Sequence, residues 1–551
     1  MTKNWHNIAK DLSILTLVIG LLFGVLLGQY PLETPDSARY AEIPREMLVT
    51  HDYVTPHLNG IKYFEKPPLF YWMQAVAIKH LGVNELGVSV VNALMALMCC
   101  LLVYIIGRKV YDRTSGIIAA LILASSSLFF ALTRIITLDM TFTTFLTACL
   151  GCFLVAKHEP HHLKRLPYVL LSYAFAGCAF MTKGLIGWLF PGMIVLVWAT
   201  IFEEWQNTKH YQIAIGVLIV LAISLPWHIW VQIRNPEFFH FYFIEQHLLR
   251  YFTPYAGRQE SWWFLPTVLI LGICPWTFFI LQTLKHHLIA LYQRHQHYRD
   301  TAFFFLWIGT VYVFYSFSQS QLIPYLLPAL PPLALLIGRY LVLHFNQRRR
   351  WLINFSFIVF FIVSLTGATI VYIYADANHY LSFAHALIIL AAFLGLSGIM
   401  TNFVYWQYGL RHGVYALFIT FSCLLISLNP IITIANNHSV KPLIDVLNQT
   451  LTPNDEVVSY SNYYQDLPFY LQRRITIVNS FGELSFGVEH QDAEDWMIDT
   501  ETLLKRWQDT KRMYMIADVE DFENLVKNEN IVFYPIKRYT DKVLVTNHEL
   551  P

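Results

Sequence analysis

The sequence predicts an all-α polytopic membrane protein with a small soluble α/β domain at its C-terminal end. Of its 551 residues, 56% are hydrophobic and 14% are charged, whereas soluble proteins carry about 25% charged residues. Apolar runs long enough to cross a bilayer recur as far as residue 432. Residues 433–551 contain 19 of the 37 acidic residues, so we expect a membrane domain over 1–432 and a separate domain over 433–551.

The membrane domain is expected to contain about 13 transmembrane helices, because a spanning helix needs about 20 predominantly apolar residues. The segments that meet this requirement are residues 12–30, 87–107, 114–132, 140–156, 167–182, 184–202, 211–232, 262–283, 301–317, 325–344, 352–374, 381–401 and 412–432.

Basic residues orient these helices, since cytoplasmic loops carry an excess of lysine and arginine. The thirteen helices place all the strongly basic segments on one side, namely residues 3–10, 108–113, 157–165, 285–299 and 348–350. The opposite, outer side receives the loops 31–86, 133–139, 233–261 and 318–324 and the whole chain after residue 432.

Residues 433–551 are predicted to fold as an α/β domain on the outer face. The β-like runs are 456–460, 474–478, 513–516 and 543–546, and the polar helical segments are 500–509 and 518–528. All seven cysteines lie in apolar stretches, which excludes a domain stapled by disulfides. A net charge of +1 gives no indication of a nucleic-acid partner.

The first functional motif follows the first predicted helix directly. Asp36, Arg39 and Tyr40 are spaced at i, i+3 and i+4, so they share a face if the segment is helical. Asp36 lies at the bilayer edge, where an acid needs a partner or a function. The competing interpretation is an interfacial amphipathic helix with solvated ion pairs, such as Glu42 with Arg45.

The second motif is Tyr63-Phe-Glu65-Lys66-Pro67-Pro68. The two prolines stiffen the backbone and keep the preceding residues out of helical geometry, which sets the direction of the two charged side chains. Lysine binds phosphate as a compact charge, and glutamate is an oxygen ligand for hard cations. The alternative is an interfacial turn anchored by aromatic residues.

Further polar residues lie where other predicted helices meet the outer surface. Asp139 would open a helix there, and its alternative role is an N-cap that complements the helix dipole. Lys183, His247, Arg250 and Tyr325 lie at the same boundary in separate loops, and each could be a snorkelling or structural residue.

The convergence of charged residues from five outer loops favours a site for a lipid-linked phosphate. The cations that could bind the phosphate are Lys66, Lys183 and Arg250. The acids that could hold a metal or assist the acceptor are Asp36, Glu65 and Asp139. A transporter would instead place such charges near the middle of the membrane, so a transport function is the less favoured interpretation.

These motifs resemble the bacterial aminoarabinose transferases that modify lipid A, within the GT-C class of membrane glycosyltransferases that use polyprenyl-phosphate sugars. Protein O-mannosyltransferases belong to the same class. The matching residues are 36–47, 63–69, 137–139, 182–184 and 324–325, and the tail adds 465–471 and 482–487. The chain departs from the family pattern at Gln246 and at Gln321, where family members usually carry a charge.

The resemblance implies inverting transfer of 4-amino-4-deoxy-L-arabinose, or a related sugar, from undecaprenyl phosphate to lipid A at the periplasmic face of the inner membrane. The implied catalytic residues are Asp36, Glu65 and Asp139, with Glu65 and Asp139 as ligands of a divalent metal ion. The implied substrate-binding residues are Arg39, Tyr40, Tyr63, Lys66, Lys183, His247, Arg250 and Tyr325. In this reading Asp36 orients the amino sugar through its ammonium or stabilises an oxocarbenium-like state.

The alternative enzyme is a transferase that glycosylates protein serine or threonine, like the O-mannosyltransferases. Its acceptor is a hydroxyl, so Asp36 would act as a general base. A lipid A phosphate is already an anion near neutral pH and needs little deprotonation.

Overall fold

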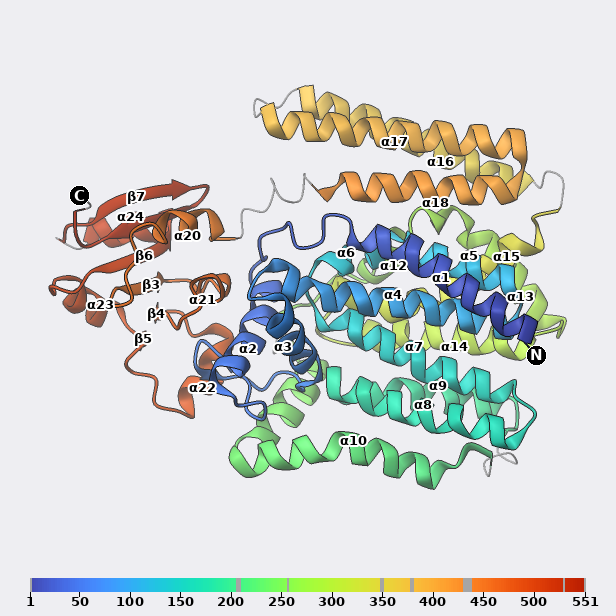
Figure 1. Cartoon of the computed structure of the whole chain (residues 1–551), viewed down its shortest axis with the longest axis horizontal. Helices are drawn as coiled ribbons and strands as arrows, with labels where there is room; N and C mark the ends of the chain where they lie inside the picture. Colours follow the sequence, from blue (N-terminus) through green and yellow to red (C-terminus); the bar gives the residue numbers. More distant parts are fainter. Residues whose placement is uncertain are drawn as a thin grey trace.

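Figure 1 shows an elongated molecule in which a helical bundle forms one part and an α/β domain forms the other. The computed structural model describes residues 2–204, 210–254, 257–346, 351–376, 381–429, 439–528 and 531–549. The N-terminus lies at the end of the bundle away from the α/β domain (Figure 1). The predicted fold class, a polytopic helical domain followed by a soluble α/β domain, is confirmed.

Each of the thirteen predicted segments coincides with a helix or a bent pair of helices. These helices are α1 (Thr2–Gly24), α4 (Glu85–Val110), α5 (Arg113–Ala124) with α6 (Ser127–Arg134), α7 (Leu138–Lys157), α8 (His162–Lys183), α9 (Ile186–Ile201), α10 (Ile213–Arg234), α12 (Phe264–Gly272) with α13 (Ile280–Tyr292), α14 (Tyr298–Ser316), α15 (Leu330–Leu343), α16 (Trp351–Asp376), α17 (Leu381–Tyr408) and α18 (Leu410–Ser427). Within the described ranges, eight helices are long and apolar enough to cross a membrane, or ten if each bent pair is one span.

The two bent spans have a local cause in the sequence. The first bends by 58° between α5 and α6, where Ser125 and Ser126 turn their hydroxyls back to the carbonyls of Leu121 and Ile122, a contact that bends helices. The second bends by 100° at Pro275, which has no N–H to continue the ladder.

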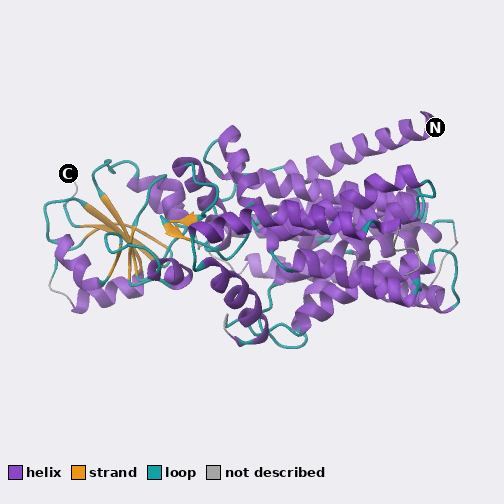
Figure 2. Cartoon of the chain, turned by 90° about the horizontal axis from the view of Figure 1, so that it is seen from below, coloured by secondary structure: helices purple, strands orange, loops and turns teal. Residues whose placement is uncertain are grey.

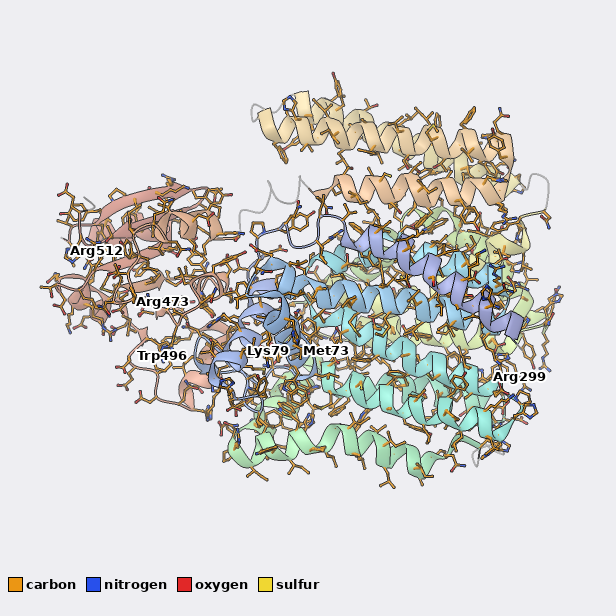
Figure 3. All side chains as sticks on the ribbon, in the orientation of Figure 1. Met73, Lys79, Arg299, Arg473, Trp496 and Arg512 are labelled. Atoms are coloured by element: carbon orange, nitrogen blue, oxygen red, sulfur yellow. The ribbon has the colours of Figure 1, made fainter. Side chains whose placement is uncertain are left out.

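The basic segments lie together at the N-terminal end of the bundle, as predicted. Asp11 of α1 pairs with Arg108 and Arg113 at 3.1 and 2.6 Å, and Lys157 pairs with Asp300 at 3.0 Å. Figure 3 shows Arg299 at this same end, far from the α/β domain. Residues 348–350 of the prediction lie outside the described residues.

The predicted outer loops gather at the opposite end of the bundle, beside the α/β domain (Figures 1 and 2). The first contains α2 (Asp36–Thr50), the hairpin of β1 (His57–Leu58) and β2 (Ile61–Lys62), and α3 (Leu69–Leu81). The loop 233–261 forms a π-helix, η2 (His240–Leu249), and α11 (Arg250–Phe252). The third part is η5 (Ile323–Ala329), a 3₁₀ helix that leads into α15.

The C-terminal domain is built on a sheet that has six strands within the described residues, in the order β5-β4-β3-β6-β8-β7. The strands are β3 (Glu456–Tyr460), β4 (Thr476–Val478), β5 (Met497–Ile498), β6 (Met513–Asp518), β7 (Tyr534–Tyr539) and β8 (Lys542–Thr546). The predicted strands and helices are confirmed, the helices as α23 (Thr500–Trp507) and α24 (Val519–Asn528). The predicted boundary between 432 and 433 lies outside the described residues.

The C-terminal domain binds the β1–β2 hairpin through hydrogen bonds between side chains and backbone groups. The side chain of Asn59 exchanges two hydrogen bonds of 3.0 Å with the backbone of Ile475. Gln491 binds the backbone of Gly60 and Lys62 at 2.9 Å each, and the indole of Trp496 donates to the Asn59 carbonyl (Figure 3). The hairpin directly precedes the Tyr63–Pro68 motif, so the domain sets where that motif begins.

The interfacial interpretation of the first motif is wrong, because α2 is buried rather than solvated. Glu42 is fully inaccessible to solvent and binds Arg45 with two hydrogen bonds of 2.6 and 2.7 Å. Helix α21 (Asp466–Leu471) of the C-terminal domain packs on α2. A desolvated ion pair of this kind needs full hydrogen bonding to persist, which the two-pronged contact supplies.

Candidate active site

A cationic cavity of about 310 Å³ opens at the outer end of the bundle. Five predicted residues line it, namely Lys66, Lys183, His247, Arg250 and Tyr325. The rest of its wall is mostly apolar or aromatic and includes Leu185, Ile186, Leu189, Leu248 and Phe252. A cavity lined by both cations and aliphatic side chains suits an anion attached to a hydrocarbon chain.

Lys183 ends α8 at the cavity and forms a buried ion pair with Asp139, the second residue of α7. Its ammonium lies 4.5 Å from the centre of the Tyr325 ring, close enough for a cation–π contact. Gly184 then turns the chain with φ of +82°, a conformation that glycine adopts without strain. Asp139 is therefore a partner of a cavity cation and does not cap its helix.

Lys66 is placed by the rigid segment between the hairpin and α3. Pro68 precedes the first residue of α3, so the two prolines hold Lys66 at the cavity wall. Burial, together with the nearby guanidinium of Arg250, lowers the pKa of Lys66 to about 7. An incoming phosphate would compensate both effects and keep the ammonium charged.

His247 and Arg250 reach the cavity from the π-helix η2 and the residue that follows it. The carbonyl of Tyr242 accepts a hydrogen bond from His247 Nδ1 at 2.6 Å, and burial lowers the pKa of His247 to about 4. The ring is therefore neutral with an acceptor at Nε2. His247 lines the cavity as predicted, but it supplies no positive charge there.

Arg250 joins the cationic cavity to a second, polar cavity of about 780 Å³. Its Nη1 donates to Gln246 at 3.0 Å and faces Glu65 at 3.5 Å. Burial raises the pKa of Glu65, but Arg250, Arg39 and Lys66 lower it more, so that the net shift is downward. Glu65 is therefore an ionised carboxylate held among cations.

The second cavity lies between the membrane domain and the C-terminal domain. It is lined by Arg39, Glu65, Glu237, His240, Phe241, Glu245, Gln246, Arg250, Arg258, Gly482, Glu483, Ser485, Phe486, Glu489 and His490. Arg250 and Gln246 line both cavities, so the two cavities meet at these side chains.

Asp36 is joined to the polar cavity through Arg39. The guanidinium of Arg39 binds both Asp36 and Glu483 of the C-terminal domain, and it lies 5.2 and 5.9 Å from the ring centres of Tyr40 and Tyr63. Asp36, Tyr40, Tyr63 and Asp139 line neither cavity themselves. Arg39 lines the polar cavity, and each of the six other predicted site residues lines at least one of the two cavities.

The predicted metal ligands do not share an open position. Glu65 faces Arg250, and Asp139 pairs with Lys183. In the part of the chain that the structure describes, no group of three or more His, Cys, Asp or Glu side chains could hold a metal ion. The divalent ion stays a prediction that this donor set does not support.

Several cavity residues were not predicted from the sequence. The most notable are Arg258 and Glu483, together with the acids Glu237 and Glu245. Glu483 lies in the tail motif 482–487, which carried the family resemblance but has no spacing that links it to residues near the N-terminus. Only the docking of the C-terminal domain brings it to Arg39.

Two family models match the chain. The model described as dolichyl-phosphate-mannose-protein mannosyltransferase matches residues 33–242, a range that includes Arg39, Glu65, Lys66 and Lys183 of the cavity walls. The model described as aminoarabinose transferase C-terminal domain matches residues 443–547, which form the α/β domain.

Two relatives from Pseudomonas carry the name undecaprenyl phosphate-alpha-4-amino-4-deoxy-L-arabinose arabinosyl transferase. The protein from Pseudomonas paraeruginosa is 32% identical over a region that covers 62% of this chain and 61% of that protein's length. Transferase 1 from Pseudomonas fluorescens is 31% identical over 71% of this chain and 70% of its own length.

The fold is similar to that of a solved structure over nearly its whole length. The crystal structure of ArnT from Cupriavidus metallidurans bound to undecaprenyl phosphate superimposes with a TM-score of 0.86 at 25% identity, covering 97% of this chain and 98% of that one. The two domains are therefore part of one shared architecture.

Proposed function

Because the chain belongs to the family of undecaprenyl phosphate-aminoarabinose arabinosyl transferases, we propose that it transfers 4-amino-4-deoxy-L-arabinose from undecaprenyl phosphate to lipid A. The observation that carries this proposal is the pair of cavities that meet at Arg250 and Gln246. One cavity suits a prenyl phosphate, and the other has room for a sugar and an acceptor headgroup. The reaction takes place at the periplasmic face of the inner membrane. The basic segments lie at the opposite end of the bundle, which would face the cytoplasm.

The donor phosphate is held in the cationic cavity by Lys66 and Arg250, with Lys183 and Tyr325 on the facing wall. The prenyl chain runs along the aliphatic wall toward the lipid. When the bond between the sugar C1 and the phosphate oxygen breaks, undecaprenyl phosphate leaves with an additional negative charge. Preorganised cations in a dehydrated site stabilise this charge as it develops.

A phosphate oxygen of lipid A attacks C1 from the side opposite the departing phosphate, and the configuration at C1 inverts. The attacking oxygen already carries negative charge, so no general base has to remove a proton. Asp36 acts by holding Arg39 at the cavity wall rather than by touching the reacting atoms, since Asp36 itself lines neither cavity.

The test is mass spectrometry of lipid A from a strain that lacks the gene and is complemented with variants. The wild-type chain should add the mass of an amino-pentose. Asp36→Asn and Lys66→Ala should add none while the proteins accumulate normally. Lys79→Ala is the matched control, since Lys79 is an exposed lysine of α3 (Figure 3) outside both cavities.

The same experiment separates the alternative activity. The match of residues 33–242 to the protein mannosyltransferase model favours a hydroxyl acceptor as the second candidate. Unchanged lipid A in the complemented strain, together with glycoproteins that lose their sugar when the gene is deleted, would replace the lipid A proposal with that one.

A further inference from the structure

The polar cavity has an excess of acidic side chains. Its wall carries five glutamates, namely Glu65, Glu237, Glu245, Glu483 and Glu489, against the three arginines Arg39, Arg250 and Arg258. A cavity with this charge favours a cationic group in the ligand.

The cations offset only part of this charge, and Glu237 also has a cationic partner, Lys62, at 3.0 Å. Arg39 binds Asp36 and Glu483, and Arg250 faces Glu65 and donates to Gln246. Together with Asp36, the five glutamates outnumber the three arginines and Lys62, so the lining and its ion-pair partners carry more acids than basic side chains.

A second observation independently indicates a ligand. Arg39 is 7% exposed, and its Nε has no hydrogen-bond partner among the residues that the structure describes. A buried donor of this kind is rare in folded proteins and requires an explanation. A hydroxyl oxygen of a bound sugar would satisfy it.

The position of the cavity relative to the phosphate site defines which group of the donor arrives there. The sugar C1 is attached to the phosphate in the cationic cavity, and the sugar must extend past Arg250 and Gln246, which line both cavities. C4 lies across the pyranose ring from C1, so the 4-amino group points away from the phosphate and into the polar cavity.

We propose that the polar cavity is the recognition site for the protonated amine of the donor sugar, and that Glu483 of the C-terminal domain is its carboxylate partner. This inference rests on the proposed function, because the amine belongs to the proposed donor. It assigns the C-terminal domain a direct part in choosing the sugar.

Glu483 is suited to this role by its surroundings. Its side chain is 16% exposed, and Gln465 donates to its Oε1 at 2.9 Å, which orients the carboxylate. Each of its oxygens has one protein donor and keeps capacity for another. Burial raises the pKa of Glu483, Arg39 opposes this shift, and the nearby charge of Glu65 adds to it. An ammonium beside Glu483 would favour its ionised form.

The test compares two donors in the purified full-length protein, one with the free amine and one with an N-acetylated amine. The wild-type enzyme should prefer the free amine in kcat/KM. Glu483→Gln should reduce this preference by about 10- to 100-fold, the loss expected for a hydrogen bond to a charged group. Glu483→Asp keeps the charge and should retain most of the preference.

Two controls separate recognition from general damage. Glu494→Gln changes an exposed acid of the same domain and should leave both rates unchanged. Glu483→Gln should bind undecaprenyl phosphate, which has no sugar, with wild-type affinity. An unchanged preference in Glu483→Gln would overturn the inference while leaving the proposed function intact, whereas a wild-type enzyme that transfers neither sugar would contradict the proposed function itself.

If Glu483→Gln does not fold, the wild-type enzyme still provides a test. The preference between the two donors should disappear above the pKa of the donor amine, where the amine is neutral. Effects of pH on the phosphate site cancel in this ratio, because both donors share the phosphate. A preference that persists at high pH would overturn the inference.

Discussion

The depressed pKa of Lys66 makes donor binding depend on pH in a range where the donor phosphate itself does not titrate. Burial and Arg250 lower the pKa of this lysine to about 7 from its ordinary value of 10.5. The protonated fraction in the free enzyme therefore falls from about one half at pH 7 to about one hundredth at pH 9. A lowered lysine pKa means that the cation is present at low pH and lost as the pH rises.

The affinity for the donor should consequently fall by on the order of 50-fold between pH 7 and pH 9, with a slope that approaches about tenfold per pH unit above pH 8. The fall is limited by the loss of one charge-assisted contact, about 1.5–3 kcal/mol. Other groups at the cavity do not produce this slope: Glu65 is ionised, His247 is neutral, and Arg250 stays charged.

The assay is equilibrium binding of a donor analogue with a neutral pentose, measured in lipid nanodiscs between pH 6 and pH 9 without acceptor. Its phosphodiester keeps one negative charge throughout, so the slope reports the protein. Lys66→Arg is the matched control, since arginine stays protonated, and its profile should be flat. A flat profile in the wild-type protein, or the same slope in both proteins, would refute the assignment of Lys66 to the phosphate.

Three further predictions concern the supports of the site. Gly184→Ala should cost about 1–3 kcal/mol of stability and weaken the binding of undecaprenyl phosphate. The reason is that φ of residue 184 is +82° and an added Cβ would approach Tyr242 Oη to 2.6 Å. An unchanged melting temperature and an unchanged affinity would contradict this prediction. Asp139→Asn should destabilise the fold by roughly 3–5 kcal/mol, because it leaves a buried cation unpaired. The double variant with Lys183→Met should regain stability in thermal denaturation but should not regain sugar transfer. Recovery of transfer in the double variant would remove the pair from the site. Asn59→Ala breaks two hydrogen bonds to the C-terminal domain and should lower stability by about 1–3 kcal/mol. The loss should be measurable as faster proteolysis of residues 439–549 and as a lower kcat. An unchanged cleavage rate would show that the hairpin is not the main attachment of the domain.

The predicted helices were confirmed because their signal is local. A span of about 20 apolar residues needs a helix in any tertiary arrangement, since lipid offers no partners for backbone polar groups. The outer ends of these helices could also be predicted from local sequence. Lys66, Lys183 and Arg250 were predicted to lie there, and they line one cavity. Charges near a bilayer edge are few, so their gathering on one side is visible in the sequence.

The roles of the acids were not determined by such local signals. Asp139 has the spacing of a helix cap or a metal ligand, yet it neutralises Lys183. The catalytic role predicted for Asp36 stays a prediction, and the structure shows this carboxylate in an ion pair with Arg39. The role of a carboxylate depends on the cation that lies nearest to it, and helix packing determines which cation that is.

From the sequence alone we could predict a membrane protein, the end of its helices at which the cavities open, and three cations that line one of them, Lys66, Lys183 and Arg250. The second, acidic cavity, whose wall is formed in part by the C-terminal domain, is visible only in the folded chain. Arg39 and Glu483 are 444 positions apart, and no periodicity in either segment refers to the other. Their contact depends on how a whole domain docks on the β1–β2 hairpin, which is a property of surfaces rather than of local sequence.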